Sequence, residues 1–228
     1  MRHYLSLAAP VVLLTATAVW QPSGQLVGPG TSAATPAPAA TQVLTALPRP
    51  ESLKFAVVGD AGDGDRPQYE IGQQMAIARA TFPFEFVIAL GDNMYGRQEP
   101  VDFVTKFQKP YQQLLEGGVH FYGALGNHDK QENRFYPGFN MGGERFYTFA
   151  RQNVRFVVLE TNMLDPKQLA WAEETLRSSQ ETWKIAYFHH PLYSSGGRHG
   201  SDVELRVVLE PRLVAHGVSV VFSSHDHI

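Results

Sequence analysis

The sequence predicts a layered α/β domain, and three observations lead to this fold class. Short runs of apolar, often β-branched or aromatic residues recur along the chain, which is typical of strands in the core of a sheet. Segments with helical spacing of apolar residues lie between these runs. Polar clusters follow directly after several of the runs, where strands would end. Strands that alternate with helices indicate stacked layers of sheet and helix.

The apolar runs are the predicted strands, and several of them end in a glycine followed by a polar residue. They occupy residues 53–58, 84–90, 119–125, 155–160, 184–188 and 218–222. Residues 139–149 favour instead a pair of antiparallel strands, which would make the sheet mixed.

Helices are predicted between the strands. They occupy residues 69–79, 101–115, 166–178 and 202–215. Pro110 is expected to kink or end part of the second helix, and Pro211 to interrupt the fourth. Asp165 and Pro166 have the residue types preferred at the N-cap and in the first turn of the third helix.

Composition excludes several classes of function. A net charge of −3 does not favour a protein that neutralises many nucleic-acid phosphates, and no nucleic-acid-binding surface is evident. The same charge does not exclude a phosphate substrate, because bound metal ions can invert the local field. The chain has no cysteine, so a disulfide framework, a zinc ribbon and a thiol nucleophile are excluded.

The N-terminal residues resemble a targeting segment. Arg2 and His3 precede an apolar run, and Ala16-Thr17-Ala18 resembles a small-residue cleavage site, so residues 1–20 are predicted to be a secretory signal peptide. The alternative is an uncleaved membrane anchor, although Pro10 weakens a stable span.

A linker is predicted between this segment and the globular part. Residues 21–50 are rich in Pro, Ala and Thr, and residues 51–228 form the predicted domain. The protein is therefore expected to be exported to the periplasm or the cell exterior, or to stay tethered by an uncleaved N-terminal segment. No membrane span is expected once the signal is removed.

Polar residues that suit a metal pair follow predicted strands that are far apart in the sequence. They are Asp60, Asp92, Asn127, His128, His189 and His225. Because ligands of α/β sheets bind outside the carboxyl ends of the strands, these side chains are expected to converge. Carboxylates, amide oxygens and imidazoles bind Fe, Mn and Zn. Two such ions about 3.5–4 Å apart suit phosphoryl transfer.

Each motif taken alone has an ordinary structural explanation. Gly59-Asp60 after a strand is usually only a turn. Asn127-His128 can be a polar turn, and a segment in which His225 and His227 share one side can be a surface loop. The metal-site interpretation depends on the whole combination, in this order and at strand ends.

Together the motifs occur in the order found in a known family. They are Gly59-Asp60-Ala61-Gly62, Gly91-Asp92-Asn93-Met94-Tyr95, Gly126-Asn127-His128-Asp129, Ala186-Tyr187-Phe188-His189 and Ser224-His225-Asp226-His227. On these motifs, residues 53–228 resemble the calcineurin-like metallophosphoesterases and, within them, the purple acid phosphatases of the tartrate-resistant type. The resemblance implies an α/β/β/α sandwich of mixed sheets with a metal site at the carboxyl ends of the strands.

The subfamily depends on two positions. Many members of the superfamily have a metal-binding histidine two residues after the first aspartate, whereas this chain has Asp60-Ala61-Gly62. Tyr95 stands where purple acid phosphatases have the tyrosinate that binds ferric iron. The alternative for Tyr95 is a packed aromatic side chain near the sheet edge.

The resemblance implies a division of ligands between two metal ions. The first, Fe(III), would be held by Asp60, Asp92, Tyr95 and His227. The second, Fe(II), Zn or Mn, would be held by Asn127, His189 and His225, with Asp92 as the bridge. A hydroxide bound to these metals would hydrolyse phosphate monoesters, as in acid phosphatases.

The resemblance also implies residues that contact the substrate. His128 would hydrogen-bond the phosphate and protonate or stabilise the leaving oxygen, and Asp129 would orient His128. His199 and Arg198 are candidate phosphate contacts in a glycine-rich loop, or simply a charged loop tip. His190 is expected to support the site rather than to bind metal.

Three features depart from the family pattern. Ala186 replaces a usual valine, and Ser224 replaces a usual glycine, which is expected to shift the last loop slightly. Members of the family continue with further strands, whereas this chain stops at Ile228. It is therefore expected to be a fragment that lacks the C-terminal strands.

The substrate stays open at this point. The same centre could hydrolyse phosphodiesters, nucleotides or pyrophosphate, and Tyr136, Phe139 and Phe146 could stack a base or simply pack. A non-catalytic iron-binding domain is a further alternative. The expected partner is a small phosphate-ester molecule, and the sequence does not predict an oligomeric state.

Overall fold

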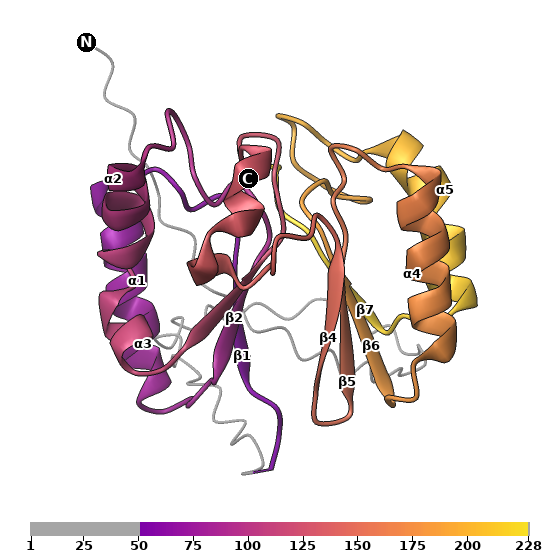
Figure 1. The fold of residues 1–228 in the computed structure, drawn as a ribbon, viewed down its shortest axis with the longest axis horizontal. Helices are drawn as coiled ribbons and strands as arrows, with labels where there is room; N and C mark the ends of the chain where they lie inside the picture. Colours follow the sequence, from indigo (N-terminus) through magenta and orange to yellow (C-terminus); the bar gives the residue numbers. More distant parts are fainter. Residues whose placement is uncertain (1–50, 228) are drawn as a thin grey trace, which may run out of the picture. The chain divides into compact units, whose positions relative to one another are not determined.

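The computed structural model describes residues 51–227 of the chain. The predicted signal peptide and the predicted linker lie outside these residues. Within residues 51–227, no helix is both long enough and apolar enough to cross a membrane. The described residues form layers of helix, sheet, sheet and helix, in that order (Figure 1), so the predicted α/β/β/α arrangement is confirmed.

The first sheet is parallel throughout. It consists of β1 (Phe55–Val58), β2 (Phe86–Ala89) and β3 (His120–Gly123), with β2 in the centre. Phe86 of β2 lies opposite Phe55 of β1 and His120 of β3. Because parallel strands run in one direction, their carboxyl ends lie together at one edge of the sheet.

The second sheet is mixed. It consists of β4 (Tyr147–Arg151), β5 (Val154–Val158), β6 (Trp183–Tyr187) and β7 (Val220–Phe222), in that order. β4 pairs with β5 in antiparallel fashion, whereas β5, β6 and β7 are parallel. The carboxyl ends of these three parallel strands therefore also lie at one edge.

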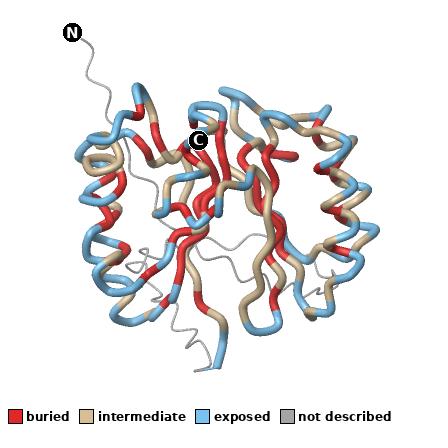
Figure 2. The backbone as a smooth tube through the Cα atoms, in the orientation of Figure 1, coloured by how far each residue is buried: buried red, intermediate tan, exposed pale blue. Residues whose placement is uncertain are grey.

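Alternation along the strands separates the core between the sheets from the cores under the helices. Phe86 and Ile88 face the other sheet, while Val87 between them packs under the helices of the first layer. In β5, Phe156 packs between the sheets and Val157 under the helices of the second sheet. Phe86 and Phe156 meet edge to face with ring centroids 5.5 Å apart. The buried strands form the centre of the molecule (Figure 2).

Helices cover the outer face of each sheet (Figure 1). On the first sheet these are α1 (Arg66–Arg79), α2 (Pro100–Phe103), the π-helix η1 (Val104–Gln108) and α3 (Gln112–Glu116). On the second sheet they are α4 (Pro166–Ser178) and α5 (Val203–Ala215). Asp165 caps α4 as predicted, since its side chain accepts from Gln168 N at 2.8 Å.

Pro110 ends part of the helix predicted over residues 101–115, as expected, since η1 ends before it and α3 begins after it. Two other predicted elements differ from the structure. Pro211 does not interrupt α5, which continues to Ala215. The carbonyl that loses its hydrogen bond to Pro211 belongs to Val207, and this residue is 69% exposed, so water can reach it.

The expected antiparallel strand pair within residues 139–149 is also wrong. The short 3₁₀ helices η2 (Gln131–Phe135) and η3 (Pro137–Phe139) precede a turn in which Asn140, Gly142 and Gly143 have positive φ. This backbone cannot continue a strand, so the antiparallel partner of β4 is β5.

Candidate metal centre

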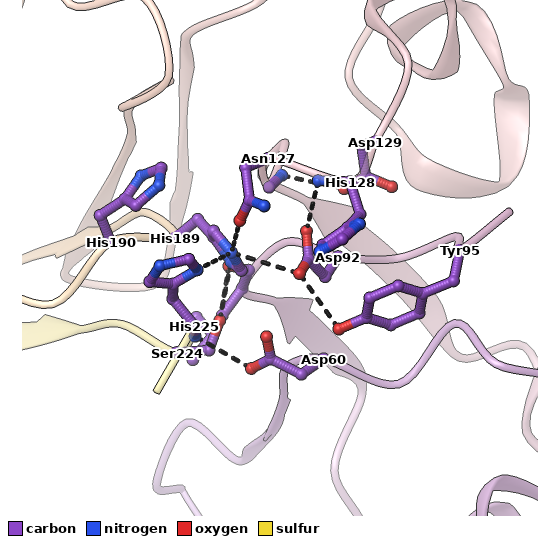
Figure 3. A network of polar contacts seen from close by, with 12 residues as sticks. Asp60, Asp92, Tyr95, Asn127, His128, Asp129, His189, His190, Ser224 and His225 are labelled. Carbon is purple, nitrogen blue, oxygen red and sulfur yellow. Dashed lines mark hydrogen bonds and ion pairs between the residues drawn. The ribbon is translucent and has the colours of Figure 1, made fainter. Parts of the chain in front are cut away.

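The loops that follow five strands meet at one edge of the two sheets (Figure 3). Asp60 follows β1, Asp92 follows β2, and Asn127 follows β3. His189 follows β6, and residues 225–227 follow β7. The predicted convergence of these polar residues is therefore observed. Asp60 and Asp92 have φ of 53° and 50°, a left-handed conformation that turns the chain sharply at both strand ends.

The Asp92 carboxylate lies in the middle of the cluster. Its Oδ1 accepts from His128 N at 2.9 Å, and its Oδ2 accepts from the Tyr95 hydroxyl at 3.0 Å. Oδ2 also lies 3.4 Å from His189 Nε2. The carboxylate therefore faces both halves of the cluster, and its side chain is almost fully buried.

His189 is held with one ring nitrogen toward the protein and the other toward the cluster. Its Nδ1 lies 3.1 Å from Leu90 O and 3.1 Å from Ser224 Oγ, and Ser224 Oγ donates to Leu90 O at 3.0 Å. A carbonyl oxygen only accepts hydrogen bonds, so Nδ1 carries the proton. In the neutral ring the lone pair of Nε2 then points into the cluster.

The atoms that surround His189 Nε2 fit a cation. Asn127 Oδ1 and His225 Nδ1 each lie 3.0 Å from Nε2, and Asp92 Oδ2 lies 3.4 Å away. Two ligand atoms at right angles around an ion, with bonds of about 2.1 Å, lie roughly 3 Å apart. Oxygen and nitrogen lone pairs that face one another at this distance repel each other, and a proton or a cation between them removes this repulsion.

A second group of ligand atoms surrounds Asp60. Its Oδ2 accepts from His225 N at 3.0 Å, while its Oδ1 is buried without a hydrogen-bond partner among the described residues. That oxygen lies 3.4 Å from His227 Nε2, which in turn lies 3.5 Å from the Tyr95 hydroxyl. A buried carboxylate oxygen without a hydrogen bond needs an explanation, and a bound cation provides one.

Ligand atoms cluster closely enough for metal binding in two groups that share His189. Those of Asp60, Asp92 and His189 lie within 4.8 Å of one another, and so do those of His189, His190 and His225. His190 Nδ1 lies 2.7 Å from Thr161 Oγ1, which also accepts from the His190 backbone N–H at 3.2 Å. Thr161 thus contacts one ring nitrogen of His190, and the role of His190 as a supporting residue stays a prediction.

The electrostatic environment favours the metal-binding forms of Asp92 and His225. Burial acts to raise the pKa of Asp92. In the absence of a metal ion, the hydrogen bond and charge of a protonated His189, together with the His128 N–H, lower it to about 2. Burial and the charge of His189 lower the pKa of His225 to about 4. Near neutral pH, Asp92 is therefore ionised and His225 is neutral, which are the forms that bind metal.

Tyr95 and Asp60 are shifted in the other direction. Burial, followed by the nearby carboxylates of Asp92 and Asp60, raises the pKa of Tyr95. Burial also raises the pKa of Asp60, against the charge of His189. Both shifts are caused first by burial, which disfavours the charged form of each side chain.

The structure contradicts the expected contact between Asp129 and the His128 ring. The Asp129 carboxylate instead accepts from Gly126 N at 2.9 Å, from Asn93 N and Nδ2 at 3.1 and 2.9 Å, and from Asn133 Nδ2 at 3.2 Å. These donors hold the turn after β3 against the loop after β2. The His128 ring packs against Tyr95, with centroids 4.8 Å apart.

The two candidate phosphate contacts lie differently. The His199 ring lies against the His225 ring, with centroids 4.2 Å apart, so the loop that carries it reaches the cluster. Arg198 is exposed on the same loop. No hydrogen bond or ion pair joins its side chain to another described residue, and the structure thus places it near the cluster without fixing its direction.

Two residues with clear roles in the cluster were not predicted. Ser224 was recognised only as a departure from the family pattern, yet its hydroxyl contacts His189. Asp226 lies between the histidines of the last motif and binds the loop that carries His199. The only sequence signal for the role of Asp226 is that its carboxylate lies between two candidate ligands. The sequence does not tell which loop such a side chain contacts.

The comparisons with known proteins agree with this geometry. The family model described as calcineurin-like phosphoesterase matches residues 53–228. The chain belongs to this family. Purple acid phosphatase 17 of Arabidopsis thaliana is 26% identical over 212 residues, which cover 77% of this chain and 62% of that protein. The tartrate-resistant acid phosphatase type 5 of Oryctolagus cuniculus is 26% identical over 221 residues, covering 77% and 67%. The predicted resemblance to the purple acid phosphatase type is confirmed.

A solved structure supports the family fold. A dimetal phosphatase from Danio rerio superimposes with a TM-score of 0.62 at 16% identity, covering 77% of this chain and 82% of that one. At this identity the likeness concerns the fold alone. The chain spans less than two thirds of the length of the Arabidopsis relative, so its activity as a calcineurin-like phosphoesterase is a matter of proposal.

Proposed function

We propose that this chain hydrolyses phosphate monoesters with a pair of bound metal ions. The observation that carries the proposal is the arrangement around Asp92, whose carboxylate lies between the Tyr95 hydroxyl and His189 Nε2. Two further observations add to it: Asp60 Oδ1 has no hydrogen bond among the described residues, and His189 Nε2 faces the cluster. Membership of the calcineurin-like phosphoesterase family supports the same chemistry.

The proposed ligands divide between the two halves of the cluster. Asp60, Tyr95 and His227 hold one ion, which we propose to be Fe(III). Asn127, His189 and His225 hold the other, Fe(II), Zn or Mn, and Asp92 serves both. The contacts of Asp92 with groups on each side support this division. When bound, the ions neutralise charge on the phosphoryl oxygens and lower the pKa of a water molecule.

The remaining work is done by side chains of this chain. His128 hydrogen-bonds the phosphate and gives a proton to the leaving oxygen, as a general acid. Its backbone is fixed by the bond from His128 N to Asp92, and its ring by the contact with Tyr95. His199 provides a second contact to the phosphate from its position next to His225. Arg198 adds positive charge at the rim.

Packing of three aromatic rings favours monoesters over nucleotides. Phe139 is fully buried, Tyr136 packs on Phe103 with centroids 4.3 Å apart, and Phe146 packs on Trp171 at 4.9 Å. Phe139 is therefore closed to a base, while Tyr136 and Phe146 are half-buried and have one side of the ring engaged in the protein. The nucleotide alternative needs an aromatic surface on which a base can stack, and it is therefore less well supported.

The test is the His128→Ala variant of the full chain, assayed with an aryl phosphate monoester and the matching diester. Loss of a general acid typically costs about 10²–10⁴ in rate, so the variant should lose that much turnover and keep its metal content. His120→Ala, at the exposed start of β3, is the control and should match the wild type.

Two results would count against the proposal. Wild-type protein that contains both ions and shows no turnover would exclude the enzyme and leave the iron-binding alternative. Equal rates on monoester and diester would remove the monoester preference, while leaving phosphate-ester hydrolysis itself intact.

A further inference from the structure

Residues 194–200 form an irregular loop beside the metal centre. The loop contains Gly196, Gly197 and Gly200, and a Cβ placed on Gly197 or Gly200 would meet nothing within 4 Å. Inside the loop, Gly196 N donates to Ser194 Oγ at 3.0 Å, and at its base Ser194 N donates to Ser201 Oγ at 2.9 Å. Such a glycine-rich loop has little packing of its own to fix its position.

Asp226 supplies the hydrogen bonds that fix this loop. Its Oδ1 accepts from His199 N at 3.1 Å, and its Oδ2 accepts from Gly200 N at 3.1 Å and from the Ser194 hydroxyl. The three donors come from both ends of the loop. Hydrogen bonds to an ionised carboxylate are stronger than neutral ones, and here three of them converge on one side chain.

The backbone that carries Asp226 is itself part of the proposed metal centre. His225 N donates to Asp60 Oδ2 at 3.0 Å, and Ser224 N donates to His189 O at 2.9 Å. His227, on the other side of Asp226, lies 3.4 Å from Asp60 Oδ1. Any group that orders residues 225–227 therefore also orders the carboxylate to which the loop is bound.

We infer that Asp226 is a positioning residue, which holds the loop of residues 194–200 and its His199 against the metal centre and links the position of this loop to cation binding. The inference rests on the proposed function only in taking His225 and His227 as metal ligands. With a cation bound, residues 225–227 are held firmly and the loop stays closed. Without the Asp226 carboxylate, the loop opens whether or not a cation is bound.

Trypsin can measure the position of this loop, because the Arg198–His199 bond lies at its exposed tip. The full chain would be digested with and without Zn²⁺, and the fragment that ends at Arg198 followed by mass spectrometry. In the wild type, Zn²⁺ should slow this cleavage. In Asp226→Ala, cleavage at Arg198 should be about tenfold faster, since three hydrogen bonds are lost, and Zn²⁺ should no longer slow it.

Two further variants make the result specific. Ser195→Ala changes an exposed loop residue that has no hydrogen bond to any residue of 51–227, and it should behave as the wild type. Ser194→Ala removes one of the three donors to Asp226 and should give an intermediate rate. A residue with only a local structural role would alter the rate but not its dependence on Zn²⁺.

The inference would be overturned if trypsin cleaved Asp226→Ala at the wild-type rate, or if Zn²⁺ fully protected that variant. If Asp226→Ala fails to fold by circular dichroism, Ser194→Ala decides, and an unchanged cleavage rate there would overturn it. The assay requires no turnover. A chain without phosphatase activity can therefore still confirm the role of Asp226, and an active chain can refute it.

Discussion

The hydroxyl of Ser224 supports His189 in a way that a glycine at this position could not. Ser224 Oγ directs its hydrogen to Leu90 O, so it presents a lone pair to His189 Nδ1. Two acceptors, Leu90 O and Ser224 Oγ, thus face the same N–H and fix the direction of the ring. The serine at this position thus adds a contact to a proposed ligand.

Ser224→Ala should weaken metal binding several-fold and leave the fold intact. Removal of a partner behind a ligand imidazole typically costs about 10–100-fold in affinity, and here Leu90 O remains, so the effect should lie near the lower end. Competition with a chelator measures it, and Ser219→Ala, at an exposed position, is the control. Equal affinities for the two variants would contradict this role.

Tyr95 tests the identity of the first ion. Its hydroxyl donates to Asp92 Oδ2, and burial together with nearby carboxylates raises its pKa, so the side chain stays protonated unless a strong cation offsets those charges. Protein loaded with ferric iron should have a visible absorption band that Tyr95→Phe removes, with an unchanged circular dichroism spectrum. The same band in the variant would exclude a tyrosinate ligand.

At the scale of elements, local sequence patterns predicted most strands and the ends of well-capped helices. The helix over residues 166–178 was predicted at its correct bounds because Asp165 and Pro166 mark its start. The expected interruption at Pro211 is wrong for a physical reason. A proline leaves one carbonyl without its hydrogen bond, and the energetic cost of this loss depends on whether water reaches that carbonyl. That exposure is a property of the folded layers and is absent from the local pattern.

The packing of α1 depends on Gly72. A Cβ at this position would lie 2.0 Å from Pro110 O, in the turn between η1 and α3. Overpacking typically costs about 1–3 kcal/mol, and alanine gains up to about 1 kcal/mol over glycine in a helix. Because the clash is with backbone, Gly72→Ala should lower the free energy of unfolding by about 2 kcal/mol.

Urea unfolding followed by circular dichroism measures this change. Gln74→Ala, on the exposed side of the same helix, should stay within about 0.5 kcal/mol of the wild type. A Gly72→Ala variant as stable as the wild type would mean that α1 and the turn at Pro110 can separate without cost.

At the scale of the whole molecule, the proposed centre draws on both sheets. Asp60, Asp92 and Asn127 follow strands of the first sheet, whereas His189 and His225 follow strands of the second. The position of these residues after strands predicted that they would meet. The contacts of Asp129, Ser224 and Asp226 could not be predicted, because each depends on which loop of another strand lies opposite.

The central claim is that one carboxylate, Asp92, serves two metal ions at the edge shared by both sheets. Metal analysis of the full chain tests it most directly, on the wild type, on Asp92→Asn and on the control Glu85→Gln, which changes an exposed acid just before β2, at the opposite end of that strand from Asp92. Two ions per chain are expected in the wild type and the control, and most of both should be lost in Asp92→Asn. Two ions retained in Asp92→Asn, or none in the wild type, would contradict the account.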